Sequence, residues 1–358
     1  MSSLDIPAQE EGARMDGSLI TDAMRDMIGR WQGEPHVGGQ VHLDDIRRFA
    51  KAVGDNNPLW LDVDYAMGTR WRGIIAPPTF VDRFTPFYVL ADDNSQGYLG
   101  GPLPITRPFK HGFSAGDEYE SFRPVRPGDF ITLTTRLDDV FEKQSRPGIG
   151  RMLLLRYVKA YRNQRNEVVS VCRWTSVCYE GPPEGEQIPD TSQTPARAPA
   201  IVNPVSPTIE TEEQWAAQES FEDVKEGCEL PSLSRLQTQK RFVRYAQASN
   251  DLSDIHYDYK LMRSRGMPDV IGQGALSAAY IANMVTNWCT PDGFLKKLSV
   301  QYRHYSFPGD VLTTKGVVTS KLQEHGDNLV ACDVWAENQY GRKVTIGQAV
   351  VSLPARER

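Results

Sequence analysis

The sequence predicts an α+β fold made of two repeats, each a long antiparallel sheet wrapped around a nearly apolar helix. The first observation is a duplicated segment: AVGDNNPLWLDVDYA and GIIAPPTF are matched by QASNDLSDIHYDYKL and DVIGQGAL at a constant offset of 196 residues. The second is a turn, RPGD in one half and FPGD in the other, that precedes a long strand in each copy. Each half then has the same order of helix, duplicated segment, second helix and strands.

The domain organisation follows from composition along the chain. Residues 1–20 belong to an acidic stretch without an apolar core, and we expect a flexible tail there. Residues 181–207 are rich in Pro, Ser and Thr without a hydrophobic period, which predicts a linker. We therefore expect a first folded half over residues 21–180 and a second over residues 208–358.

In the first half, apolar residues recur at helical spacing before the duplicated segment, at Ile46, Phe49, Ala50 and Val53. A second helix is expected after Pro78, with a kink at Pro86. Residues 92–112 contain an insertion of about 15 residues relative to the second half, and loops of that length often cover a pocket. Strands are predicted over residues 117–123, 129–142, 150–162 and 166–179.

In the second half, Phe242, Tyr245 and Ala246 show the same helical spacing. The helix after Gly274 is apolar on nearly all sides, which requires burial within the sheet. Its apolar residues are Ala275, Leu276, Ala278, Ala279, Tyr280, Ile281, Met284, Val285 and Trp288. Strands are predicted over residues 294–304, 310–321, 328–338 and 343–353. This pattern is typical of a hotdog fold, and two such halves are expected to join their sheets edge to edge as a double hotdog.

Composition narrows the classes of partner. The net charge of −6 without a basic stripe argues against nucleic acid, and no apolar run of 18 residues is present to span a membrane. We expect a cytoplasmic protein, because the N-terminus lacks the apolar core of a secretory signal. The five cysteines form no CxxC pair, and no phosphate-binding loop, dinucleotide fingerprint or HExxH is found. We therefore expect neither a metal nor a cofactor.

The second copy of the duplicated segment carries residues suited to proton transfer. Asp251 and His256 can converge if the chain between them turns, and a carboxylate and an imidazole that share a water perform general acid and base catalysis. Gly274 at a helix start presents a free N–H to a carbonyl that gains negative charge. Taken singly, His256 could instead cap a helix and Gly274 could simply form a tight turn.

The first copy lacks both functions. Asp55 matches Asp251, but Trp60 stands at the position of His256 and Pro78 at that of Gly274. Tryptophan cannot move a proton at neutral pH, and proline has no backbone N–H. The first half is therefore interpreted as a retired site that shapes the pocket.

The motif NDLSDIH followed by GQG resembles that of the MaoC-like (R)-specific enoyl-CoA hydratases, usually written GDxNPxH with a later HG. The first half, with GDNNPLW and IAPP, resembles the related dehydratase N-terminal domain. The resemblance implies that Asp251, His256 and Gly274 are catalytic. It implies syn addition of water to a trans-2-enoyl thioester, or the reverse. The sequence departs from the motif at Asn250, Ser253, Asp254 and Gln273, and we expect Asp254 to be solvated.

Substrate contacts are predicted for Ser253, Gln273 and Gly272 of the second half and for Trp60 and Pro78 of the first. The expected substrate is an acyl-CoA thioester with a bulky or long acyl group, with acyl carrier protein as another possible carrier. The expected assembly is a homodimer of double hotdogs or a heteromer with another hotdog chain. Two alternatives stay open, a hotdog thioesterase and a non-catalytic acyl-binding subunit of a heteromeric hydratase.

Overall fold

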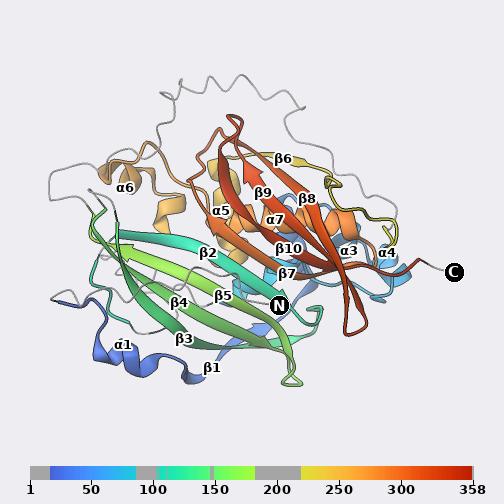
Figure 1. Cartoon of the computed structure of the whole chain (residues 1–358), viewed down its shortest axis with the longest axis horizontal. Helices are drawn as coiled ribbons and strands as arrows, with labels where there is room; N and C mark the ends of the chain where they lie inside the picture. The colour runs from blue at the N-terminus through green and yellow to red at the C-terminus, as the bar shows by residue number, and fades with distance from the viewer. Residues whose placement is uncertain are drawn as a thin grey trace.

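The computed structural model describes residues 17–85, 103, 105–109, 111–145, 149–181 and 219–356. Within these residues the strands form a single ten-stranded antiparallel sheet in the order β1-β3-β4-β5-β2-β7-β10-β9-β8-β6 (Figure 1). The strands of the first half are β1 (Trp31–Gln40), β2 (His111–Ser121), β3 (Phe130–Gln144), β4 (Arg151–Arg162) and β5 (Val168–Tyr179). Those of the second half are β6 (Leu233–Leu236), β7 (Phe294–Tyr302), β8 (Val311–Glu324), β9 (Asp327–Glu337) and β10 (Lys343–Ser352).

All eight predicted strands are confirmed, although β2 begins six residues earlier than expected, at His111. The two edge strands, β1 and β6, were not predicted. β1 contains Pro35 and several glycines, and its pairing with β3 is interrupted by two register shifts. β6 is four residues long. Neither strand shows an alternating pattern long enough to be recognised.

The two halves join through β2 and β7, which pair antiparallel at the centre of the sheet. Their register is symmetric, because Glu118 pairs with Ser299, and these two residues occupy equivalent positions of the repeats. Gly116 pairs with Gln301, and Glu120 pairs with Lys297. A pseudo-twofold axis therefore passes between Glu118 and Ser299, as the expected double hotdog requires.

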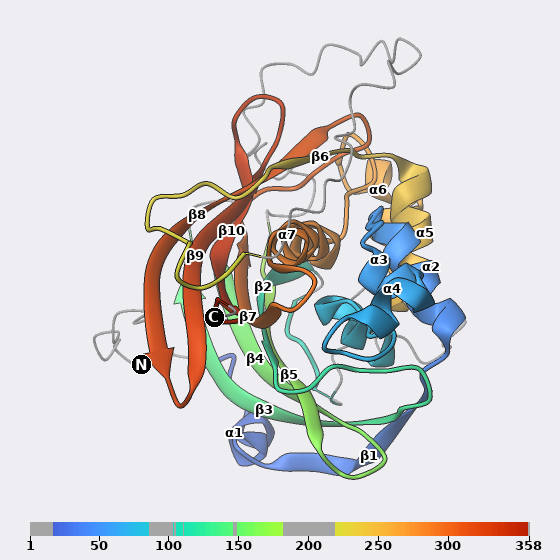
Figure 2. The ribbon, with the colours of Figure 1, turned by 90° about the vertical axis from the view of Figure 1, so that its right-hand side faces the viewer.

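The helices pack on the concave face of the sheet, where β7 to β10 curve around α7 (Figure 2). Of the 16 residues of α7, 14 are buried, which confirms the expectation for an apolar central helix. The helices are α1 (Asp22–Met27), α2 (Leu43–Val53), α3 (Pro58–Leu61), α4 (Val63–Gly68), α5 (Gln239–Ser249), α6 (Tyr259–Ser264) and α7 (Gly274–Cys289). Two 3-10 helices are η1 (Pro78–Phe84) and η3 (Asp254–His256).

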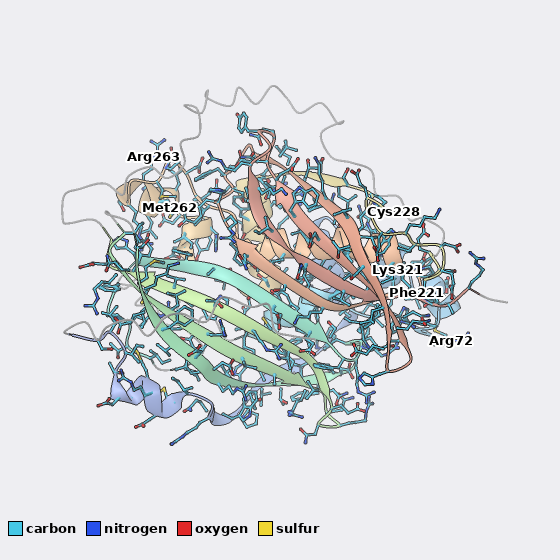
Figure 3. All side chains as sticks on the ribbon, viewed as in Figure 1. Arg72, Phe221, Cys228, Met262, Arg263 and Lys321 are labelled. Atoms are coloured by element: carbon cyan, nitrogen blue, oxygen red, sulfur yellow. The ribbon has the colours of Figure 1, made fainter. Side chains whose placement is uncertain are left out.

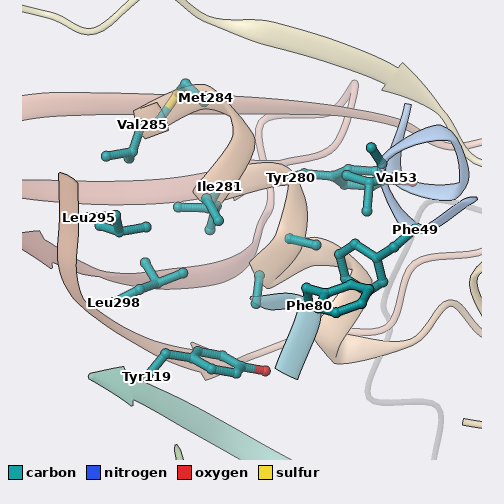
Figure 4. Packing of buried hydrophobic residues seen from close by; sticks show 14 of the residues in the cluster. Phe49, Val53, Phe80, Tyr119, Tyr280, Ile281, Met284, Val285, Leu295 and Leu298 are labelled. Carbon is teal, nitrogen blue, oxygen red and sulfur yellow. The ribbon is translucent and has the colours of Figure 1, made fainter. Parts of the chain in front are cut away.

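The core runs continuously from one repeat to the other. Ile281 and Val285 of α7 lie over Leu298 of β7 (Figure 4). Equivalent helices also meet, since the rings of Phe49 in α2 and Tyr245 in α5 lie 5.8 Å apart between centroids. Their positions are related by the offset of 196, so this contact also lies near the pseudo-twofold axis.

The segment around Phe221 and Val224, which leads into the second repeat, contacts Lys321 of β8. The Lys321 ammonium lies 4.4 Å from the centroid of the Phe221 ring and donates a hydrogen bond to the Val224 carbonyl at 2.7 Å (Figure 3). The linker expected over residues 181–207 lies outside the described residues apart from Gly181. No helix among the described residues is long and apolar enough to cross a bilayer.

The first repeat differs from the sequence-based expectation after Pro78. In place of a helix that continues through Pro86, the described residues form the short 3-10 helix η1, which ends at Phe84. Its cap Thr85 is extended, as is usual for a residue before proline. Pro86, the expected kink, lies outside the described residues, as does most of the insertion over residues 92–112. Asp82 in η1 is only 4% exposed.

Candidate active site

Asp251 and His256 are brought together by a turn at the end of α5. The helix stops at Asn250, whose φ of 66° places it in the left-handed region and redirects the chain. The 3-10 helix η3 then returns His256 toward the helix end. As a result, Nε2 of His256 lies 3.5 Å from Oδ2 of Asp251. The turn that the sequence analysis required between these residues is present.

The His256 ring is oriented by its other nitrogen. Nδ1 lies 2.7 Å from the carbonyl oxygen of Ile271, which can only accept a hydrogen bond, so Nδ1 carries a proton. In the neutral ring Nε2 is then the basic nitrogen, and it faces Asp251. A separation of 3.5 Å is longer than an ordinary direct hydrogen bond, and it lets one water placed beside the pair contact both atoms.

The Asp251 carboxylate has unused hydrogen-bonding capacity. Its Oδ1 is buried and accepts no hydrogen bond from the residues that the structure describes. An unsatisfied buried carboxylate oxygen is costly, and such atoms concentrate at sites that bind a water or substrate. The Asp251 side chain as a whole is 18% exposed, so a ligand can reach the carboxylate.

Gly274 is the first residue of α7, where a backbone N–H has no partner within the helix. The glycine is also required by close packing, since an added Cβ would lie 2.8 Å from the ring of Tyr302. Gly272 is similarly confined, with an added Cβ 2.5 Å from Oγ of Ser306. Both glycines therefore let the backbone approach the pocket closely, and Gly274 does so at the positive end of the helix dipole.

These residues line a pocket that opens to solvent. One wall comes from the second repeat, where Asp251, His256 and Gly274 meet. The opposite wall comes from the first repeat, through η1, β2, β4 and β5. The pocket therefore spans the boundary between the two repeats, and each repeat contributes different residue types to its lining.

The opposite wall contains three charged residues that the sequence analysis missed: Asp82, Asp117 and Lys159, hereafter the acid–lysine cluster. They are 4%, 7% and 1% exposed, respectively, and all three line the pocket. Lys159 Nζ lies 3.9 Å from Oδ1 of Asp82 and donates a hydrogen bond to Thr85 Oγ1 at 3.4 Å. A signal existed in β4, where Lys159 interrupts the inward series Leu153, Leu155, Tyr157 and Tyr161.

Tyrosine hydroxyls hold both carboxylates of the cluster. Tyr119 donates to Oδ2 of Asp82 at 2.6 Å, and Tyr302 donates to Oδ2 of Asp117 at 2.5 Å. Burial raises the pKa of Asp82 to about 7, against the lowering effect of Lys159, and burial also raises the pKa of Asp117. Because the Tyr302 ring also packs against Gly274, Asp117 fixes the position of a ring at the start of α7.

The other predicted residues of the second repeat divide into two groups. Gln273 and Gly272 line the pocket, and Nε2 of Gln273 donates to the Phe242 carbonyl at 3.0 Å. Ser253 is buried and lies outside the pocket lining. Its backbone carbonyl accepts a hydrogen bond from the backbone N–H of His256 at 3.1 Å. Asp254 is half-buried rather than solvated, because it accepts a 2.7 Å hydrogen bond from the Tyr257 hydroxyl within the same turn.

Trp60 and Pro78 line a second, smaller pocket at the equivalent place in the first repeat. Neither residue lines the pocket that contains Asp251. The Trp60 indole N–H donates to Oδ2 of Asp55 at 2.9 Å, and Pro78 is the first residue of η1. Among the described residues, no group of three or more His, Cys, Asp and Glu side chains is arranged to hold a metal.

Comparison with known proteins agrees with this division into two repeats. The model of a FAS1-like dehydratase domain region matches residues 26–171, and that of a MaoC-like domain matches residues 224–337. A protein of Thermomonospora curvata named "Probable enoyl-CoA hydratase alpha subunit" is 29% identical over 194 residues, 52% of this chain. The match spans 60% of that relative's length.

Solved structures resemble nearly the whole chain. A structure named "MaoC-like dehydratase" superimposes with a TM-score of 0.66 at 21% identity, over 92% of this chain and 99% of the other. A Mycobacterium tuberculosis protein described as having a double hotdog fold superimposes with a TM-score of 0.59 at 15% identity, over 92% and 97%. These likenesses establish the fold as a double hotdog.

Proposed function

We propose that the chain interconverts a 2-enoyl-CoA thioester and the corresponding (3R)-3-hydroxyacyl-CoA thioester, because its second repeat matches the model of a MaoC-like domain. The proposal is carried by one observation above all: the Asp251 carboxylate and the His256 imidazole, 3.5 Å apart, line one pocket together with the first residue of α7. The relative named as an enoyl-CoA hydratase subunit supports the same class of substrate.

In the hydration direction, a water is held between the free oxygen of Asp251 and Nε2 of His256. The dyad takes one proton of the water as its oxygen attacks Cβ of the enoyl group. Negative charge then develops on the thioester oxygen, which the N–H of Gly274 stabilises at the start of α7. The proton held by the dyad is delivered to Cα on the same face, which restores the starting protonation state. Dehydration follows the same steps in reverse.

The first repeat contributes the far wall of the pocket rather than a second catalytic dyad. Because the pocket extends from the dyad to the first repeat, we place the acyl group beyond the reacting carbons, against this far wall. A bulky or long acyl group therefore remains our proposal, with coenzyme A as the carrier. A second hotdog chain remains the proposed partner, since a relative is named as an alpha subunit.

The proposal is tested by mixing the purified chain with a panel of trans-2-enoyl-CoA thioesters and following the loss of the conjugated-enoyl absorbance. Free thiol is measured in the same samples, because a thioesterase releases it and a hydratase does not. Loss of absorbance without thiol release is the expected result. Release of thiol at the rate of absorbance loss, or no turnover of any thioester, contradicts the proposal.

A further inference from the structure

The acid–lysine cluster has an apolar counterpart in the second repeat of the same chain. The offset of 196 that relates the duplicated segments places Ala278 at the position of Asp82, and the offset of 181 between the later strands places Leu298 at that of Asp117. Both counterparts are buried, at 0% and 1% exposure. The second repeat thus packs its helix against its sheet with hydrocarbon at these two positions.

The sheet register identifies the counterpart of Lys159. Lys159 of β4 pairs with Thr135 of β3. The equivalent of Thr135 is Gly316 of β8, which pairs with Val334 of β9. Val334 is 1% exposed. All three members of the acid–lysine cluster therefore replace buried apolar residues of the other repeat.

The second repeat shows that a stable hotdog fold does not require charged residues at these three positions. A hotdog repeat is stable with Ala, Leu and Val at the three positions, as the second repeat demonstrates. Burying three ionisable groups costs several kcal/mol per ion before their mutual attraction is counted, and apolar replacements of such groups are often neutral or stabilising. Stability of the fold therefore does not account for the charged residues at these positions. Their place in the pocket wall gives them access to a ligand.

We propose that the acid–lysine cluster is a polar subsite that binds a hydroxyl or keto oxygen on the acyl group, on the wall facing Asp251 and His256. This proposal rests on the proposed function, and it names a substrate class: oxygenated acyl thioesters rather than plain hydrocarbon ones. The Lys159 ammonium donates a hydrogen bond to either kind of oxygen, and a carboxylate of Asp82 or Asp117 accepts one from a hydroxyl.

The charges of the subsite favour a neutral oxygen over other groups. An anionic group on the acyl chain would meet two carboxylates. A cationic group would lose its hydration in a buried site beside the Lys159 ammonium, which is costly. A hydrocarbon end would offer the cluster no hydrogen bond, whereas a hydroxyl or ketone offers one without adding charge.

The test compares unbranched trans-2-enoyl-CoA thioesters of increasing length, each prepared with a methyl end and with a hydroxymethyl end. For at least one length, wild-type protein is expected to prefer the hydroxymethyl member by about tenfold in kcat/KM, the effect of one buried hydrogen bond. The variant Asp82→Ala/Asp117→Leu/Lys159→Val copies the second repeat and is expected to prefer the methyl member. Lys143→Val, which removes an exposed lysine from β3, is the matched control and should keep the wild-type preference.

The outcomes distinguish the two proposals. If wild-type protein hydrates neither member of any pair, the proposed function is contradicted, and the subsite with it. If it hydrates both members of every pair with equal kcat/KM, the subsite alone is overturned. A triple variant that keeps the wild-type preference also overturns the subsite. Should that variant fail to fold, Asp82→Ala is measured in its place and is expected to reduce the preference.

Discussion

Trp60 donates its indole N–H to Asp55 at 2.9 Å, in the positions that His256 and Asp251 occupy in the second repeat. The indole keeps a donor beside the buried carboxylate but has no basic nitrogen to take a proton. The first repeat has therefore retained the architecture of the dyad without its proton transfer. This difference motivates the first two predictions, which concern the intact dyad and the helix start beside it.

Asp251→Asn and His256→Ala are each expected to lower kcat/KM by about 10²- to 10⁴-fold, because general acid and base catalysis contributes that much. The rates are measured by enoyl absorbance on a substrate that wild-type protein turns over. Asp254→Asn is the matched control, since this carboxylate lies in the same turn but outside the pocket lining. Full activity in both dyad variants would show that the dyad is wrongly assigned.

Gly274→Ala and Gly274→Pro form a pair that isolates one backbone N–H. Both substitutions bring a Cβ against Tyr302, but only proline removes the N–H. Proline is tolerated at the first position of a helix, as Pro78 shows at the start of η1. We expect kcat of the proline variant to fall about 10²- to 10³-fold below that of the alanine variant. Equal kcat values in the two variants would rule out a role for this N–H.

Lys159→Val alone is expected to destabilise the fold, because it leaves Asp82 and Asp117 buried without their cation. Breaking a buried ion pair by removing one partner typically costs about 3–5 kcal/mol. The triple replacement that copies the second repeat should be more stable than this single variant, since contacting residues do not act additively. Urea unfolding at pH 8 measures both free energies. The reverse order of stability would contradict the internal comparison with Val334.

The pKa of Asp82, which burial raises to about 7, predicts how stability depends on pH. An unfolded aspartate titrates near 3.9, so the folded state binds more protons between about pH 4 and pH 7. The contribution of Asp82 to the free energy of unfolding therefore falls as the pH rises through this range. The ionisable groups around it are Lys159, Asp117, Tyr119 and Asp251.

The measurement compares urea unfolding of wild-type protein and Asp82→Asn at pH 5 and pH 8. The variant has no carboxyl to titrate, so the wild-type free energy of unfolding should drop relative to that of the variant at the higher pH. A relative gain for wild-type protein at pH 8 would mean that the folded state favours the ionised carboxylate.

The fold was largely predictable because its signals lie in local sequence. The constant offset of the duplicated segments and the long alternating strands required no knowledge of distant contacts, and neither did the apolar helix after Gly274. The edge strand β1 was missed because Pro35 and its glycines weaken every local strand signal. The helix expected after Pro78 was predicted to continue through Pro86, whereas η1 ends at Phe84.

The site was predictable only on one side. Asp251 and His256 are close in sequence, so their turn could be anticipated from residues 250–256. Asp82, Asp117 and Lys159 come from three elements separated along the chain, and only the packing of the sheet brings them into one wall. No local pattern distinguished Asp82 or Asp117. For Lys159 the one local signal was that it interrupts the inward-facing apolar residues of β4.

The symmetric pairing of β2 with β7 has an evolutionary consequence. In an assembly of two identical chains, every substitution appears on both sides of the axis, so a charge introduced near it is introduced twice. Here one gene encodes both sides, and Lys159 could enter one half while Val334 stayed in the other. Covalent linkage of the two halves thus allows a symmetric frame to hold an asymmetric interior.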